Sequence, residues 1–230
     1  MDISKAYTFI PEDKEWVKKI VIGGAFALFS FLFIPIFFLI GYQVAVVKNV
    51  MNGEENPLPE WEEWGQMFMD GLVVWAAMFI YALPVVLLGI CSLFLWLPAV
   101  LDSGGDFGGA LSAGATFGMV VLGCLMFLFA IALAFIMPAL YIQYARTGEF
   151  GPMFQVAEVI KIARENVVDI LIVIVAAIAA SLVLGLVTWI PICGWLISAA
   201  GTTWIMIATA HLYGQIAAKT DGKPVDFAAA

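Results

Sequence analysis

The stretch from residue 71 to residue 101 reads GLVVWAAMFIYALPVVLLGICSLFLWLPAVL and contains no charged side chain. Residues 20–47, 107–145 and 170–218 share this property, so all 10 basic and 18 acidic residues lie outside these four apolar blocks. An apolar run of about 20 residues can cross the hydrocarbon core of a bilayer, where a central charge costs about 2.5–3.5 kcal/mol. The pattern therefore predicts an all-α integral membrane protein.

Composition agrees with this class. The chain of 230 residues is 63% hydrophobic and only 12% charged, with a mean hydropathy of +1.03, whereas an ordinary soluble domain is about 25% charged. We expect a single membrane domain over residues 1–230. Because the blocks lack charged residues, they argue against proton relays and voltage sensors, which need ionisable groups at membrane depth.

Block lengths predict how often the chain crosses the membrane. At a rise of about 1.5 Å per residue, residues 170–218 hold two spans that break near residues 189–194. Blocks 71–101 and 107–145 each hold one span, joined by a polar turn at residues 102–106. Block 20–47 is ambiguous. It makes one tilted span, or it breaks near Phe33, Ile34 and Pro35 and forms a short hairpin that returns without crossing.

The distribution of basic residues sets the expected orientation, because Lys and Arg favour the cytoplasmic side. Both termini are predicted to be cytoplasmic, which needs an even number of crossings before Arg146 and favours the hairpin. The single-span alternative stays open, with an acidic loop at residues 54–70 outside. The basic residues concerned are Lys14, Lys18, Lys19, Arg146, Lys161, Arg164, Lys219 and Lys223.

An internal repeat emerges from two similar hexapeptides. PEDKEW at residues 11–16 matches PEWEEW at residues 59–64, and a glycine follows at the same distance in both, Gly23 and Gly71. Proline and acidic residues favour a helix start, and tryptophan favours the headgroup region. Each copy is predicted to be a short helix on the membrane surface, with Trp16 and Trp64 as interfacial anchors.

The ends of the blocks also resemble one another. A polar residue and a glycine precede a proline after three of them, at Asn52-Gly53, Thr147-Gly148 and Asp221-Gly222, which is a helix stop signal. Residues 152–169 would be a third, amphipathic interfacial helix. These features predict a threefold repeat of helical hairpins with units at about residues 1–53, 54–148 and 149–222, followed by a tail at 223–230.

Few side chains are candidates for cofactor chemistry. His211, the one histidine, is a candidate haem or chlorophyll ligand or, alternatively, a hydrogen-bond donor between helices. Cys91, Cys124 and Cys193 are scattered, and we expect them to be small buried hydrophobes. We expect no metal and no cofactor, and bound lipid as the natural ligand.

Acidic, small and proline residues supply further candidates. The acids of residues 54–70 could attract a cation or a basic partner segment, or form a solvated face. Ala110, Gly114 and Gly118 form a helix-packing face, used within the chain or between copies. The intramembrane prolines would kink helices and either line a transport path or shape the bundle; they are Pro35, Pro84, Pro98 and Pro138.

The sequence contains no nucleophile elbow, zinc-protease motif, phosphate-binding loop or dinucleotide-binding fingerprint. We therefore expect that the protein is not an enzyme, and we expect no nucleic-acid partner.

Several of these motifs together resemble a known family. MDISKAY at the N-terminus, Gly41-Tyr42, PLPEW at residues 57–61 and HLYGQ at residues 211–215 are similar to the prokaryotic membrane family called domain of unknown function 4013. The resemblance covers essentially the whole chain. It implies a multi-pass protein of the cytoplasmic membrane in bacteria or archaea, and it brings no established activity or catalytic residues.

The leading hypothesis for function is a scaffold or oligomer-forming protein that organises the bilayer or neighbouring membrane proteins. Interfacial helices beside a short hairpin would occupy more area in one leaflet than in the other. One alternative is a channel or transporter for a small neutral or lipid-like solute. Another is an accessory subunit of a larger membrane complex. The expected partners are membrane lipid, further copies of the chain and a membrane-protein partner.

Overall fold

The chain is built from helices, as expected. The computed structural model describes residues 1–101, 106–190 and 193–222, with side chains described at 1–94, 114, 116–190 and 193–222. No β-strand occurs in those ranges, so the all-α prediction is confirmed. The elements are α1 (Ile3–Thr8), η1 (Ile10–Glu12), α2 (Trp16–Leu28), η2 (Ser30–Leu32), α3 (Ile34–Asn52), α4 (Trp64–Leu101), α5 (Asp106–Thr147), η3 (Gly151–Phe154), α6 (Val156–Glu165), α7 (Val167–Val187) and α8 (Cys193–Thr220).

The chain divides into two compact units. Unit 1 comprises residues 1–77 and 136–230, and unit 2 comprises residues 78–135. Within the described residues, five helices are long and apolar enough to cross a membrane: α3, residues 64–94 of α4, residues 116–147 of α5, α7 and α8. Their number and composition support the prediction of a multi-pass membrane protein.

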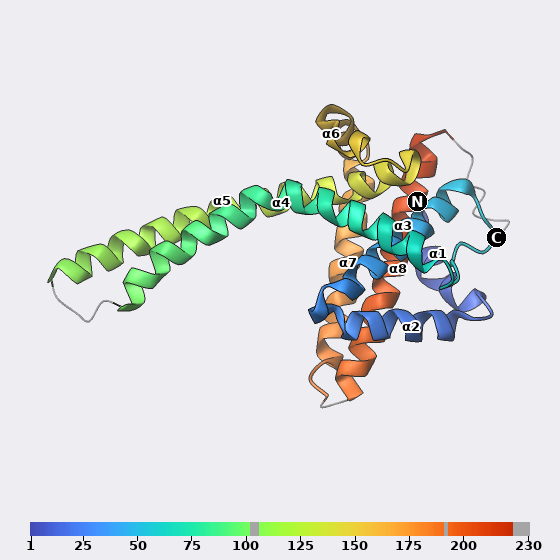
Figure 1. Cartoon of the computed structure of the whole chain (residues 1–230), viewed down its shortest axis with the longest axis horizontal. Coiled ribbons are helices and arrows are strands. Elements are labelled where there is room, and N and C mark those ends of the chain that lie inside the picture. The colour runs from blue at the N-terminus through green and yellow to red at the C-terminus, as the bar shows by residue number, and fades with distance from the viewer. Residues whose placement is uncertain (102–105, 191–192, 223–230) are drawn as a thin grey trace. The chain divides into compact units, whose positions relative to one another are not determined.

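Helix α8 lies at the centre of unit 1. Helix α7 runs beside it, α2 lies across it, and α3 packs on its C-terminal part (Figure 1). Glycines allow these close approaches, because a Cβ on Gly23 of α2 would overlap Thr203, and one on Gly214 of α8 would overlap Val50 of α3. The absent side chains let the helix backbones meet.

Helices α3 and α4 cross at a second pair of glycines. A Cβ on Gly41 would overlap the backbone carbonyl of Met67, and a Cβ on Gly71 would overlap that of Phe37. On α3, Gly41 lies four residues after Phe37, which Gly71 approaches. On α4, Gly71 lies four residues after Met67, which Gly41 approaches. This crossing holds the first turns of α4 against the middle of α3.

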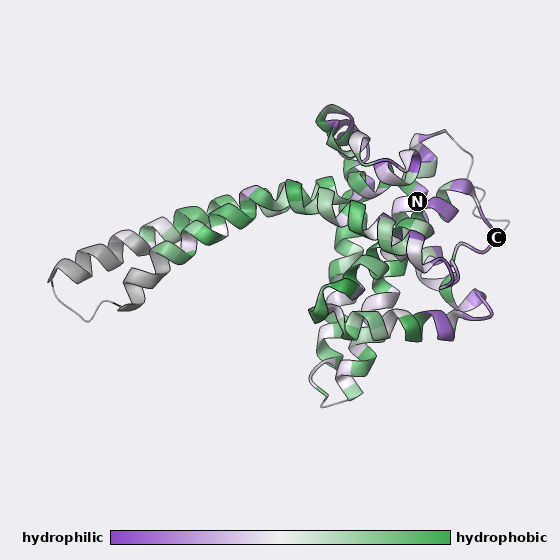
Figure 2. Cartoon of the chain, in the orientation of Figure 1, coloured by the Kyte–Doolittle hydropathy of each residue, from purple (hydrophilic) through white to green (hydrophobic). Residues whose placement is uncertain are grey.

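The core of unit 1 is apolar and aromatic. Phe9, Ile10, Ile20, Tyr42, Trp61 and Ile207 belong to one buried cluster that joins η1, α2, α3, α8 and the segment before α4. Hydrophilic residues gather at the start of α2 and in the segment between α3 and α4, whereas α7 is hydrophobic along most of its length (Figure 2).

The first apolar block is interrupted where the sequence suggested. Helix α2 ends at Leu28 and α3 begins at Ile34, with η2 between them. Phe33 has a φ of 65°, which is unusual for a residue other than glycine. Pro35 lies in the first turn of α3, where no helical amide is needed, so this proline starts a helix instead of kinking one.

The hexapeptides do not form the short surface helices that we predicted. Of residues 11–15, only Pro11 and Glu12 are helical, in the single 3₁₀ turn η1, and residues 57–60 are irregular. In the second copy, alternating prolines disfavour helical geometry, and side chains capture three successive carbonyl oxygens: Asn49 binds that of Pro57, Lys19 that of Leu58 and Tyr42 that of Pro59. Both copies still precede a helix that begins at their tryptophan, at Trp16 and Trp64.

The predicted helix stops are confirmed. Gly53, Gly148 and Gly222 follow α3, α5 and α8, with φ values of 74°, 67° and 66°. Glycine adopts this left-handed conformation without the steric penalty of a Cβ. The predicted third amphipathic segment contains α6, whose Val159 and Ile162 are buried. The threefold repeat itself stays a prediction.

Unit 2 consists of the distal part of α4 and the proximal part of α5, which run side by side in opposite directions (Figure 1). Helix α4 continues through Pro84. The cysteines contradict the expectation of burial, since Cys91, Cys124 and Cys193 are all free and exposed. Their helices have few protein neighbours there, and a thiol next to lipid needs no partner.

Candidate functional site

Several polar side chains of unit 1 are buried, and each needs a hydrogen-bond partner in the low-dielectric interior. Lys19, Asp70 and Gln215 find theirs on segments that are far apart in the sequence. The buried residues concerned are Lys19, Asp70, Gln143, Asn166, Thr203, His211 and Gln215.

Asp70 is the centre of the most connected group. Its Oδ2 accepts a hydrogen bond from Lys48 of α3 at 2.8 Å, and its Oδ1 accepts from Gln66 at 2.9 Å and from the hydroxyl of Tyr144 of α5 at 2.7 Å. The side chain is 8% exposed. Three donors on three helices therefore hold one carboxylate, and Lys48 balances its charge.

A second polar group continues the connection to α8. The hydroxyl of Tyr141 donates to Oε1 of Gln43 at 2.6 Å, and Nε2 of Gln43 donates to the carbonyl oxygen of Met206 at 3.2 Å. The ring of Tyr141 lies 5.7 Å from that of Tyr213. Polar contacts therefore link α3, α5 and α8, where the sequence showed only isolated polar residues in apolar blocks.

A polar cavity of about 300 Å³ opens beside Asp70, at the crossing of α3 and α4. Asp70 and Gln66 line it from α4, and three glutamates line it from the preceding segment. The full lining is Gly41, Ala45, Asn49, Pro59, Glu60, Glu62, Glu63, Gln66, Met67 and Asp70. Its carboxylates favour a positively charged group, although Asp70 already has the three donors described above.

The acidic run near this cavity is partly neutralised. Glu60 contacts Lys19 at 2.7 Å and Lys18 at 3.9 Å, and Asp70 contacts Lys48. Glu62 and Glu63 remain exposed at the cavity, as do Glu54 and Glu55 before it. No three His, Cys, Asp or Glu side chains within the described ranges are arranged to hold a metal ion.

Lys19 anchors the segment between α3 and α4. Its side chain is 3% exposed and its Nζ lies 2.7 Å from both Asp13 and Glu60. The indole nitrogen of Trp61 donates to the backbone carbonyl of Lys19 at 3.1 Å, and the Trp61 ring stacks on Tyr42 at 4.3 Å. Burial alone would lower the pKa of Lys19, but the hydrogen bonds that its ammonium group donates to Asp13 and Glu60 outweigh burial, and the pKa is raised.

His211 binds the N-terminal segment to α8. The amide of Gln215 exchanges two hydrogen bonds with the backbone of Asp2, at 2.7 and 3.0 Å, which orients its Nε2 as the donor to Nδ1 of His211 at 3.0 Å. Nδ1 therefore accepts, and the imidazole proton lies on Nε2. The His211 ring lies 4.3 Å from Phe9. The histidine is thus a buried packing and hydrogen-bonding group.

Ion pairs also join the last turns of α5 and α8 to their neighbours. Arg146 contacts Asp221 at 2.7 Å, and Lys219 contacts Asp169 of α7 at 2.6 Å. These contacts keep the C-terminal end of α8 next to the end of α5 and the beginning of α7.

Trp16 and Trp64, the predicted interfacial anchors, lie among other aromatic rings. Trp16 packs edge-on against Trp204 at 5.6 Å. Trp64 is 41% exposed and lies 5.7 Å from both Phe26 and Trp61. Both tryptophans therefore help to pack unit 1, and their position at the membrane interface stays a prediction.

The other predicted residues do not form one site. Pro84 and Pro138 lie within α4 and α5. Gly114 has open space where a Cβ would be, so it makes no close helix contact of the predicted kind with the described residues. Pro98 and Ala110 lie outside the residues whose side chains are described.

Sequence reasoning missed the groups around Asp70 and Gln43. The available signal was a polar residue within or next to an apolar block, since Gln43 lies inside block 20–47 and Asp70 directly precedes block 71–101. Such residues normally face the interior of a bundle and find partners there.

Comparison with known proteins yields a family and no individual relative. Searches of curated proteins and of solved structures gave no match. Residues 27–193 match the sequence model of a family described as protein of unknown function, DUF4013, which covers α3 to α7 with the segments that hold Asp70 and Lys48. The match spans most of the chain, and the chain therefore belongs to the DUF4013 family.

Proposed function

We propose that this chain is a non-catalytic membrane scaffold that assembles with further copies or with partner membrane proteins. The observation that carries the proposal is the apolar surface of unit 2. No residue of α4 from 78 to 94, and none of α5 from 116 to 137 is buried. Large apolar side chains such as Phe94, Phe117 and Phe127 are 67–72% exposed. Lipid or another membrane protein must cover them.

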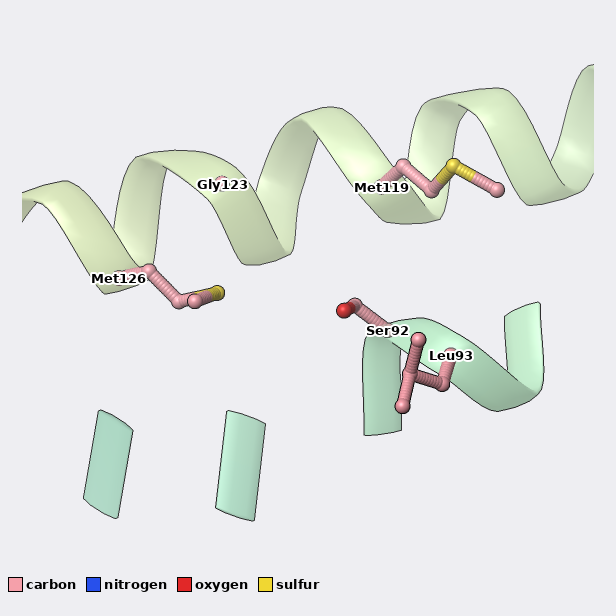
Figure 3. A pocket seen from close by; sticks show the side chains of 5 residues that line it. All are labelled: Ser92, Leu93, Met119, Gly123 and Met126. Atoms are coloured by element: carbon pink, nitrogen blue, oxygen red, sulfur yellow. The ribbon is translucent and has the colours of Figure 1, made fainter. Parts of the chain in front are cut away.

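A groove on unit 2 favours contact between its apolar surface and another membrane protein. It has a volume of about 460 Å³ and is lined by Ser92 and Leu93 of α4 and by Met119, Gly123 and Met126 of α5. Gly123 lies between the two methionines along α5 (Figure 3). Because the glycine leaves open space, the backbone of another helix could approach closely at this point. Flexible methionines adapt readily to such a partner.

The polar groups of unit 1 support a structural role. Asp70, Gln43 and Lys19 each bind groups on other helices or segments. The Asp70 carboxylate accepts hydrogen bonds from side chains of α3, α4 and α5, so it ties these three helices together. We therefore infer that the polar groups position helices and carry out no bond chemistry.

The first experiment is mass determination of the complete chain purified in mild detergent, with identification of associated proteins and lipids. We expect a defined oligomer or a stoichiometric membrane-protein partner. Gly123→Leu should shift the population towards the single chain by filling the groove. Gly185→Leu is the matched control, because Gly185 lies in α7 and also has open space around it. A single chain that binds no partner and leaves liposome shape unchanged would refute the scaffold.

The polar cavity makes a solute pathway the second candidate function. Its lining of glutamate, asparagine and glutamine is what a small polar or cationic solute would need at the entrance to a pathway. Uptake of small neutral and cationic solutes into proteoliposomes tests this candidate. Uptake above that of empty liposomes, reduced by Gln66→Leu, would favour transport over the scaffold.

A further inference from the structure

The turn between α2 and α3 exposes a cluster of large apolar side chains. Phe29, Phe31, Leu32, Phe33 and Ile34, which we call the apolar tip, are each 50–72% exposed. Large exposed apolar patches mark surfaces that contact another protein or a membrane. A turn in water normally consists of polar residues and glycine, so this turn is unsuited to an aqueous loop.

The backbone polar groups of the apolar tip form hydrogen bonds within residues 25–33. The amides of Phe29, Leu32 and Phe33 donate to the carbonyl oxygens of Ala25, Phe29 and Ser30 at 3.0–3.1 Å. The hydroxyl of Ser30 donates to the carbonyl oxygen of Ala27 at 2.7 Å. Hydrocarbon offers no hydrogen-bond partner, so a turn that enters it must satisfy its polar groups internally. The apolar tip meets much of this requirement.

Helix α2 is too short to bring the apolar tip across a bilayer. Its 13 residues extend about 20 Å, against about 30 Å for the hydrocarbon core. It also lies across α8, which is long enough to span the membrane (Figure 1). Helix α2 by itself therefore does not carry the apolar tip to the opposite membrane surface.

Both flanks of the segment return to the same polar region of unit 1. Lys19, near the start of α2, binds Glu60 at 2.7 Å. Asn49, near the end of α3, binds the carbonyl oxygen of Pro57 at 3.1 Å. The residues before α2 and after α3 therefore lie on one side of the apolar tip.

We propose that the apolar tip inserts among the acyl chains of one leaflet and that residues 16–52 enter and leave the membrane on the same side. The occupant of this surface is phospholipid hydrocarbon. Aromatic and aliphatic side chains favour the boundary between headgroups and acyl chains. The proposal concerns the place of this segment in the bilayer and holds whether or not the chain is a scaffold.

The test measures the depth of the apolar tip in the complete chain. Phe31→Cys is made in a background in which Cys91, Cys124 and Cys193 are alanine, labelled with a fluorophore, and reconstituted into phosphatidylcholine vesicles that carry quenchers at different acyl depths. Glu55→Cys serves as the aqueous control and Ile178→Cys, an exposed position on α7, as the lipid control. We expect quenching at position 31 to resemble that at position 178.

A second readout is reaction of the unlabelled thiols with a membrane-impermeant maleimide. The thiol at position 31 should react at least about tenfold more slowly than that at position 55, because an apolar environment suppresses the reactive thiolate. Rapid reaction at position 31 from either aqueous side would overturn the proposal. So would a disulfide between two copies at position 31 together with absent lipid quenching, because a second copy would then cover the apolar tip.

Discussion

At the scale of single residues, ion pairs in unit 1 hold helices together across the polar region. Asp70 and Lys19 are each almost completely buried and each contact groups on more than one element. A buried charge that loses its partner keeps the penalty of its desolvation. Removing one member of such a group therefore destabilises the fold more than removing an exposed pair.

Asp70→Leu should destabilise unit 1, because Lys48, Gln66 and Tyr144 would all lose their acceptor. We expect a loss of about 1–3 kcal/mol, measured as a lower midpoint of thermal or denaturant unfolding in detergent. Asp70→Asn keeps one acceptor oxygen and should lose less. The control is Asp169→Asn, whose partner Lys219 is 65% exposed and whose loss should stay within about 1 kcal/mol. Equal effects at positions 70 and 169 would contradict the prediction.

Lys19→Met should also lower the stability by about 1–3 kcal/mol, since the carbonyl oxygen of Leu58 and the carboxylates of Asp13 and Glu60 would lose a donor. Because the pKa of Lys19 is raised in the folded protein, its contribution is complete below the unfolded value of 10.5 and disappears as pH rises through the higher folded value. Unfolding midpoints of the unsubstituted chain and of Lys19→Met, measured between pH 7 and 11, test this pH dependence. The difference between the two midpoints should be constant up to about pH 10 and shrink above it.

At the scale of elements, glycine decides which helices meet closely. Gly41 and Gly71 bring the backbones of α3 and α4 together, whereas Gly65, one residue into α4, has open space around it. The same residue type therefore has opposite roles at positions 65 and 71 of one helix. Only the neighbouring backbone distinguishes them.

Gly41→Ala and Gly71→Ala should each destabilise the chain by about 1–3 kcal/mol, because the new methyl group would force two backbones apart. Gly65→Ala should be neutral or stabilising by up to about 1 kcal/mol, as alanine is the better helix former. Thermal unfolding of the three variants in the same detergent compares them. A loss at position 65 as large as that at position 41 would show that the close crossing of α3 and α4 is not the cause.

At the scale of the whole molecule, contacts within unit 1 bring together polar segments that are far apart in the sequence. Asp2 binds Gln215 near the end of α8, Lys19 binds Glu60, and Asp70 binds Tyr144 near the end of α5. The N-terminal segment, residues 54–63 and the end of α5 therefore belong to one polar region. This grouping favours an even number of membrane crossings before each of these segments.

Cysteines at positions 4, 55 and 149 should react with an impermeant maleimide from the same side of sealed vesicles. The variants are Ser4→Cys, Glu55→Cys and Glu149→Cys in the background without native cysteines. A single crossing by residues 20–47 would place positions 55 and 149 opposite position 4, and that result would contradict the prediction. Detergent-opened vesicles serve as the control for complete labelling.

Apolar runs alone determined the class of this protein and its long helices, and glycines determined the helix stops after α3, α5 and α8, because membrane burial and backbone geometry act locally on a continuous stretch of chain. The tertiary structure alone decided the partners of Asp70, Lys19 and His211, the irregular form of residues 57–60 and the exposure of the cysteines. These depend on side chains and carbonyl groups that are distant in sequence: Tyr42 and Asn49 capture carbonyls that a helix would have used, and no local pattern records that competition.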